Sequence, residues 1–278
     1  MSCLLLADNL FNTIAYPLHT VAGDEEAVGH EAFHLADGRR GTTDFWSPIT
    51  ANAQHTATVT CDRVRGANCW FLDRGHNLAG VQVFVEVSQD NATWQTLASP
   101  TIPSVTSHGT IVTNANGVAT EEGAWGQLVS PVGAGTYWRL RIPAMGAGLL
   151  PVVVGLWVGM AYQPANNFLM PWSEDQDDLV VKETVSEWAW RGRGPVAAPN
   201  TGTMNTKLLT DDEYDLARVT VGGHFGRGRP MWIAYDQLQA DRAFLAIRPS
   251  GNLGYRYEQS WYPRQSQIQY VEHEPLRL

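Results

Sequence analysis

Two histidines flank a glutamate at a spacing that can bind zinc. His30 and His34 stand four residues apart, and Glu31 follows the first, in the pattern H-E-x-x-H. On a helix this spacing puts both imidazoles on one face, where they could bind Zn²⁺ while the glutamate serves as general base. No third histidine follows at the spacing of the longer zinc-protease pattern. One or two helical turns are predicted at Asp24–Leu35, but the enclosing chain is β-rich and unlike the helical scaffold of a zinc protease. We therefore predict a surface turn without a catalytic zinc, and keep a zinc hydrolase only as a third hypothesis for function.

Other polar groups form weaker patterns. The acidic run Ser173–Asp178 lacks the glycine and the terminal glutamate of a calcium loop, so it predicts a solvated turn. Arginines alternate with glycine at 191–194 and 226–229, where a loop could hold an anion or a neighbouring subunit. The sequence contains no nucleophile elbow, phosphate-binding loop, C-x-x-C pair or dinucleotide fingerprint. These observations predict a protein that is not an enzyme and that needs no cofactor.

Tryptophan and arginine occur together in the C-terminal part of the chain. These two residue types dominate the energetics of many protein interfaces, and arginine stacks on aromatic rings. The alternative is that the tryptophans fill a second core. We take seven residues as candidate interface residues: Trp188, Trp190, Arg191, Arg193, Arg227, Arg229 and Trp232.

The composition narrows the class of protein. Nineteen basic against 28 acidic side chains give a net charge of −9, which argues against a partner that is nucleic acid. With 44% hydrophobic and 17% charged residues, the chain is neither disordered nor a coiled coil. The N-terminus lacks the basic and apolar regions of a signal peptide, and the apolar stretch 149–161 is too short to span a bilayer. We expect a protein made in the cytoplasm, with no membrane insertion.

Period-two alternation predicts an all-β fold. The valines at 81, 83, 85 and 87 alternate with Gln82, Phe84, Glu86 and Ser88, as in a strand with one buried face. Trp138, Leu140 and Ile142 alternate in the same way with two arginines, at 139 and 141. Further strands are predicted at Thr56–Cys61, Val152–Met160, Arg218–Val221, Met231–Tyr235, Ala243–Ile247 and Gln267–Glu272.

The turn-rich stretch Gln163–Asn167 predicts a domain boundary. We therefore place one β-sandwich domain at 1–162 and a second, smaller β-rich assembly domain at 163–278. Two long polar stretches, Thr101–Gly123 and Gly192–Asn205, are predicted to be loops.

The order of several short motifs resembles a known family. Ala36-Asp37-Gly38 is followed by Thr43 and Trp46, then by a strand ending in Ser88-Gln89-Asp90, by Trp94, and by a closing strand that contains Tyr137 and Arg139. This order resembles the discoidin, or coagulation-factor type C, family of galactose-binding-like jelly-roll β-sandwiches. The resemblance implies that Trp46 and Trp94 are core residues. In that family the Asp-Gly loop often holds calcium, but here Arg39 follows Asp-Gly and the loop is one residue longer, which weakens Asp37 as a calcium ligand.

The arrangement of a discoidin-like domain followed by a second β domain is similar to tail and baseplate proteins of tailed bacteriophages. It implies a non-enzymatic structural protein of the virion that contacts other copies of itself and neighbouring tail proteins as a homo-oligomer. The alternative hypothesis is a glycan-binding module that recognises a cell-surface glycan, because the galactose-binding-like fold is used for that purpose, although a fold does not by itself determine a function.

Overall fold

In a computed structural model, the described residues form β-strands and one short 3₁₀ helix, η1 (Ala32–Leu35). The structure describes residues 4–6, 8–36, 44–73, 75–103, 112–113, 119–120, 125–163, 169–176, 182–186, 189–192, 200–208, 230–234, 243–247, 254–256 and 264–272. Side-chain burial is described for those residues up to 163, except 112–113 and 119–120, and for 230–234. The predicted all-β class is confirmed. None of the helical residues in these ranges forms a segment long and apolar enough to cross a bilayer.

The N-terminal part is organised around a six-stranded antiparallel sheet. The order along the sheet is β2 (Thr20–Gly23), β3 (His55–Leu72), β8 (Trp125–Ile142), β4 (Phe84–Ser88) and β5 (Gln95–Ala98). A sixth strand, β9 (Leu156–Gly159), pairs with the second half of β3.

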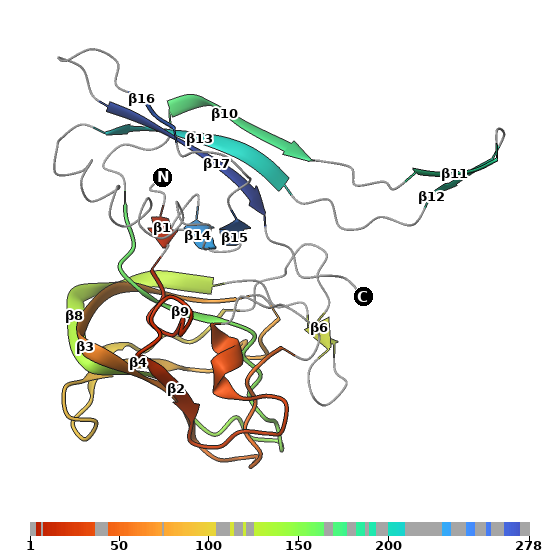
Figure 1. Cartoon of the computed structure of the whole chain (residues 1–278). Helices are drawn as coiled ribbons and strands as arrows, with labels where there is room; N and C mark the ends of the chain where they lie inside the picture. Colours follow the sequence, from red (N-terminus) through yellow and green to blue (C-terminus); the bar gives the residue numbers. More distant parts are fainter. Residues whose placement is uncertain are drawn as a thin grey trace.

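The two long strands β3 and β8 bend together and thereby form both layers of a β-sandwich (Figure 1). Their pairing shifts register between Thr60 and Arg65 and again between Ala67 and Cys69. Such bulges increase the local twist and let a strand turn a corner. The first half of β3 lies beside β2, whereas its second half lies beside β9, so one strand pair wraps around the core.

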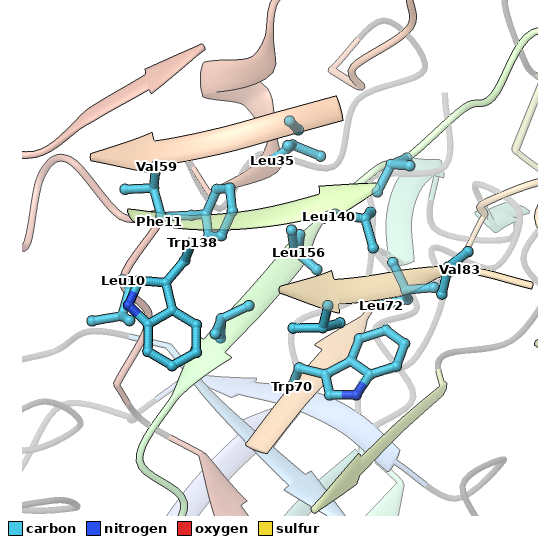
Figure 2. Close-up of a cluster of buried hydrophobic side chains, with 14 of the residues drawn as sticks. Leu10, Phe11, Leu35, Val59, Trp70, Leu72, Val83, Trp138, Leu140 and Leu156 are labelled. Atoms are coloured by element: carbon cyan, nitrogen blue, oxygen red, sulfur yellow. The ribbon is translucent and has the colours of Figure 1, made fainter. Parts of the chain in front are cut away.

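Apolar side chains from both layers fill this core (Figure 2). The predicted burial of Val83, Val85, Val87, Trp138 and Leu140 is confirmed, and each is at most 2% exposed. The strand itself differs from the prediction. β4 begins at residue 84, and Val81 is only partly buried against the core, because the segment before the strand forms a turn stabilised by backbone hydrogen bonds.

The C-terminal strands form a second antiparallel sheet. Its order is β1 (Leu4–Leu6), β14 (Met231–Ala234), β15 (Ala243–Ile247), β17 (Arg264–Glu272), β13 (Asn200–Leu208) and β10 (Leu169–Gln176), with β16 (Gly254–Arg256) also on β17. Two further pairs stand apart: β6 (Val112–Thr113) with β7 (Ala119–Thr120), and β11 (Lys182–Ser186) with β12 (Ala189–Gly192).

Two segments predicted as irregular are strands in this second sheet. The acidic run that begins at Ser173 lies mostly in β10, where residues 173–176 pair with β13. β10 stands at the end of the sheet order, and an edge strand tolerates charged residues. The end of the loop predicted at 192–205 overlaps β13, which pairs along its length with β17.

The first strand of the chain belongs to the second sheet. Leu4–Leu6 pair with β14, and Leu5 also exchanges two backbone hydrogen bonds with Tyr162, at 2.9 and 2.8 Å. A second apolar cluster lies where these strands meet β3 and β9, and it includes Phe71, Trp157 and Trp232. The boundary near residue 162 stays a prediction, and the N-terminal strand pairs across it.

Candidate functional site

One face of the N-terminal sheet is polar because the residues of each strand alternate. On β3 and β8, residues such as Val59 and Trp138 point into the core and are buried, while their neighbours are half-exposed. We call the half-exposed side, with its partners on β4, the polar face. It comprises Thr56, Thr58, Thr60, Phe84, Glu86, Ser88, Tyr137, Arg139 and Arg141.

The strand register arranges this polar face in three cross-strand rows. Arg139 on β8 pairs with Thr58 on β3 and with Glu86 on β4, so these three form the central row. Arg141 lies between Thr56 and Phe84 in one neighbouring row, and Tyr137 lies between Thr60 and Ser88 in the other. Directly opposed residues in antiparallel strands are about 4.5–5.5 Å apart, close enough for their side chains to interact.

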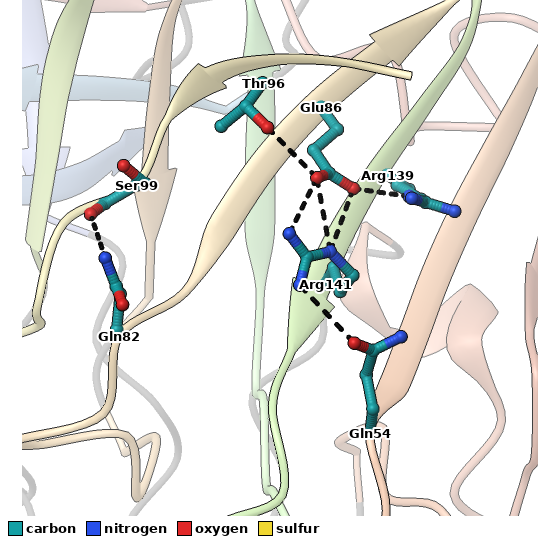
Figure 3. Close-up of polar contacts among 7 residues, drawn as sticks. All are labelled: Gln54, Gln82, Glu86, Thr96, Ser99, Arg139 and Arg141. Atoms are coloured by element: carbon teal, nitrogen blue, oxygen red, sulfur yellow. Dashed lines mark hydrogen bonds and ion pairs between the residues drawn. The ribbon is translucent and has the colours of Figure 1, made fainter. Parts of the chain in front are cut away.

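Glu86 is held by two arginines at the centre of the polar face (Figure 3). Its Oε2 accepts a hydrogen bond from Arg139 Nε at 2.6 Å, and its Oε1 accepts from Arg141 Nη2 at 2.9 Å and from Thr96 Oγ1 at 3.2 Å. Arg141 Nε lies 3.2 Å from both oxygens. Burial raises the pKa of Glu86, but the hydrogen bonds from the two arginines outweigh it and hold that pKa below its usual range. Glu86 is therefore an ionised, fully engaged carboxylate.

Each arginine also stacks on an aromatic ring. The Arg139 guanidinium carbon lies 3.8 Å from the centre of the Trp94 ring, and that of Arg141 lies 3.8 Å from the centre of the Phe84 ring. Such cation–π contacts restrict both partners and contribute about 0.5–1 kcal/mol at exposed sites. The prediction that Trp94 is a core residue is wrong, because its half-exposed ring covers Arg139 on the outside of the sheet.

The turn between β4 and β5 positions Trp94. Asp90 Oδ1 accepts hydrogen bonds from the backbone N–H groups of Thr93 at 2.8 Å and Ala92 at 2.9 Å, and from the Ser88 hydroxyl at 3.0 Å. Asn91 adopts the left-handed conformation, with φ of 59°, that short turns require. The predicted turn at Ser88–Asn91 is confirmed. These hydrogen bonds lower the pKa of Asp90 to about 2, so the carboxylate that organises the turn is ionised near neutral pH.

Four hydroxyl groups on the polar face are open to a ligand. They belong to Thr56, Thr58, Thr60 and Tyr137, and within the described part of the chain none of them makes a hydrogen bond. A hydroxyl both donates and accepts, so these groups can bind other hydroxyls as readily as water. The face thus offers polar groups in rows beside the rings of Trp94 and Phe84.

The H-E-x-x-H segment has a different structure from a zinc-binding helix. Within its described residues, helical structure is limited to the four residues of η1, and His30 precedes it. The His30 ring stacks on Phe45 at 4.0 Å, while His34 Nε2 lies 3.6 Å from Glu31 Oε2. Among the described residues, no three His, Cys, Asp or Glu side chains are grouped so that they could hold a metal ion. Asp37, the weak calcium candidate, lies outside the described residues.

Among the predicted interface residues, only Trp232 has a described side chain. It is 0% exposed, and its ring stacks on Phe71 with centres 5.6 Å apart, so it lies inside the chain and not on a surface. Its strand β14 pairs with β1 and packs against β3 and β9, and the sequence does not reveal these contacts. The remaining predicted residues are either in β12, whose side chains are not described (Trp190, Arg191), or outside the described residues altogether (Trp188, Arg193, Arg227, Arg229).

The polar face was not identified from the sequence as a site, although part of its pattern was visible. The alternation of residues 137–142 placed two arginines on one side of a strand, and the alternation of residues 81–88 placed Glu86 on one side of another. The missing information was the register, because nothing local shows that Glu86 pairs with Arg139. An aromatic residue at the exposed end of a hairpin, as at Trp94, was the remaining clue.

Comparison with solved structures finds carbohydrate-binding modules. This chain is similar to chitosan-binding module 1 of a Paenibacillus sp. IK-5 chitosanase/glucanase, with 16% identity over 54% of this chain and 98% of that chain, and a TM-score of 0.39. Another is CpGH89CBM32-5 from Clostridium perfringens, solved with GalNAc-β-1,3-galactose, at 12% identity over 51% of this chain and 94% of that chain, with a TM-score of 0.39. A pectin-binding carbohydrate-binding module aligns at 13% identity over 50% of this chain and 88% of that chain, with a TM-score of 0.35. No family model matches the sequence, and no curated protein does.

Proposed function

We propose that this protein is a non-catalytic carbohydrate-binding protein whose ligand lies across the polar face. The observation that supports this most directly is the set of four open hydroxyls beside two arginines and two aromatic rings on one sheet face. A glycan presents many hydroxyls on a partly apolar ring, so it needs matching polar groups together with aromatic surface. The alternative is an ordinary solvated sheet face, which antiparallel sheets often have.

The chemistry of the polar face argues against hydrolysis. Glycoside hydrolysis uses two carboxyl groups, one of which keeps its proton as a general acid with a raised pKa. On the polar face Glu86 is the single carboxylate among the described residues, and its pKa is lowered. The thiols of Cys61 and Cys69 are buried, and burial raises the pKa of Cys61 to about 12, so neither is a thiolate nucleophile.

The test is a glycan array with the intact protein, followed by titration calorimetry on the best ligands. Thr58→Val and Tyr137→Phe each remove one hydroxyl and keep the shape of the side chain. The double variant is expected to bind roughly tenfold more weakly, since each lost hydrogen bond costs about 0.5–1.5 kcal/mol. Thr13→Val, at a half-buried position outside the polar face, is the matched control and should bind like the original protein.

Two results would contradict the proposal. Either no glycan binds in the array, or the double variant binds as tightly as the control. Phe33 offers a further check, because it is 48% exposed on η1 and outside the polar face. Loss of binding in Phe33→Ala, with the double variant unaffected, would move the site to the loops around η1.

A role in a phage tail stays a prediction from the sequence, as do assembly into a homo-oligomer and location in the virion. Glycan binding and such a role are compatible, because a tail protein that binds a surface glycan would help attachment. The mass of the purified particle by light scattering, together with labelling of intact tails in electron micrographs, tests this setting independently of ligand binding.

A further inference from the structure

We propose that the polar face selects an acidic glycan, with Arg139 binding the carboxylate of a uronic acid residue. This inference rests on the proposed function above and names the class of ligand. It concerns the free edge of one guanidinium, which the internal contacts of the protein leave open.

Arg139 and Arg141 differ in how much of each guanidinium is engaged. Arg141 uses Nε and Nη2 for Glu86, and its Nη1 donates to Gln54 Oε1 at 3.4 Å. Arg139 donates only Nε, to Glu86. Within the described part of the chain, its Nη1 and Nη2 make no hydrogen bond, and the side chain is 21% exposed. Arg139 therefore presents unused N–H donors to solvent.

The charges around Arg139 leave an excess of one positive charge. The two arginines contribute +2 and Glu86 contributes −1, which gives +1 for the three side chains. Both Glu86 oxygens already accept hydrogen bonds from the arginines, so this carboxylate has little capacity to compete with a ligand for Arg139. The whole chain carries −9, so an acidic glycan would not be attracted by overall charge. Binding of such a ligand must come from this local group.

Arg139 is also held in place before a ligand arrives. Nε is fixed at 2.6 Å from Glu86, and the guanidinium plane is covered by Trp94 at 3.8 Å. A side chain that is already ordered loses little conformational freedom on binding. The outer edge of a fixed guanidinium matches a planar carboxylate with two parallel N–H···O hydrogen bonds.

The neighbours of Arg139 suit the remainder of a sugar. Thr58 is directly opposite Arg139 on β3, and Tyr137 and Thr60 form the next row along the same strands. Positions two residues apart on a strand are separated by about 6.5–7 Å. A carboxylate on Arg139 thus leaves the hydroxyls of Thr58, Thr60 and Tyr137 for the hydroxyls of the same or the next sugar.

The experiment compares an oligogalacturonate with a neutral galacto-oligosaccharide of the same length by titration calorimetry on the intact protein. We expect the oligogalacturonate to bind at least about tenfold more tightly than the neutral oligosaccharide, because a bidentate contact with a carboxylate is charge-assisted. The difference should shrink as salt is raised from 50 to about 500 mM, because the contact is partly exposed. A sulfated galactan is the third ligand, and preference for it over the oligogalacturonate would overturn the carboxylate assignment.

Two variants test whether Arg139 is responsible. Arg139→Gln should abolish the preference for the oligogalacturonate, and Arg139→Lys should restore only part of it, because lysine keeps the charge but lacks the planar pair of donors. Arg63→Gln, at an exposed position on the same strand β3 but off the polar face, should retain the full preference. Melting curves accompany each variant. Where a variant is unstable, the comparison of ligands on the unmodified protein still tests the preference for a carboxylate.

The outcomes separate this inference from the proposed function. If neutral and acidic glycans bind equally well, the protein binds glycans and the inference about the carboxylate is wrong. If the preference persists in Arg139→Gln, the carboxylate binds elsewhere, and the assignment to Arg139 is wrong. If no glycan of any kind binds, the proposed function itself fails.

Discussion

At the residue scale, the turn carboxylate Asp90 offers a direct pH test. Hydrogen bonds from Thr93, Ala92 and Ser88 favour its ionised form and lower its pKa to about 2, from 3.8 for a free side chain. A group whose pKa is lower in the folded state stabilises the fold above its unfolded pKa, and this contribution is lost as pH falls toward the folded pKa. The protein should therefore be more stable than Asp90→Asn above about pH 4, and the difference should disappear near pH 2.

The measurement is thermal unfolding of both proteins from pH 2 to pH 7, with the carboxyl titration followed by NMR. A midpoint for Asp90 close to 3.8, or a stability difference that does not change with pH, would contradict this account of the turn.

Glu86 is the second residue whose loss should be conspicuous. Glu86→Ala leaves the guanidinium groups of Arg139 and Arg141 close together without a counter-charge. Breaking a fully buried pair costs about 3–5 kcal/mol, but both arginines keep about a fifth of their surface exposed and can be rehydrated. We expect a loss of roughly 1–3 kcal/mol in urea unfolding.

Thr96→Val is the matched control for Glu86, because it removes a single hydrogen bond to the same carboxylate. It should cost no more than about 1 kcal/mol. Equal effects of the two substitutions would mean that the ion pairs contribute nothing measurable to stability.

At the element scale, the bent strands β3 and β8 depend on close backbone approach. A Cβ added at Gly135 would meet the Val87 side chain and would lie 2.6 Å from the Ser88 carbonyl oxygen of β4. A Cβ at Gly66, on the facing strand, would have nothing nearer than 3.7 Å. Gly135→Ala should therefore destabilise the protein by about 1–3 kcal/mol, whereas Gly66→Ala should be close to neutral. Unfolding curves of the two variants check this, and a tolerated Gly135→Ala would show that β4 does not pack this closely on β8.

How far sequence predicts these elements depends on whether a pattern is local. The alternation at residues 138–142 is local, and the strand and its buried face were predicted correctly. The extent of β3 was not, because its middle contains charged residues and a register shift that interrupt the alternation. Trp94 was misplaced for a related reason. Whether a large aromatic residue is buried depends on a partner such as Arg139, which is 45 residues away and is brought close only by the register.

At the scale of the whole molecule, two cores lie on the two sides of β3. The first fills the sandwich and includes Trp70 and Trp138, and the second lies between the sandwich and strands β1 and β14. Residues 69–72 of β3 supply alternate side chains to both, since Trp70 belongs to the first core and Phe71 to the second. This segment of β3 has no solvent face, unlike the first half of the strand, which is why residues 69–72 form a continuous apolar run.

Trp232 is one of two tryptophans in this second core, and its removal should separate the two parts of the molecule. Trp232→Ala deletes a fully buried ring that stacks on Phe71, with an expected cost of about 3–5 kcal/mol. The loss should be local, because the described residues of the sandwich that form this cluster with Trp232 come from β3, from the segment around β9 and from Leu128 of β8, and none comes from β4. Hydrogen exchange should accelerate in β1 and β14 while the amides of β4 stay protected. Trp138→Ala, in the first core, is the matched control and should expose β4 instead. If Trp232→Ala accelerates exchange in β4 as strongly as in β14, the two cores unfold as one cooperative unit, and the second sheet is an integral part of the sandwich that carries the polar face.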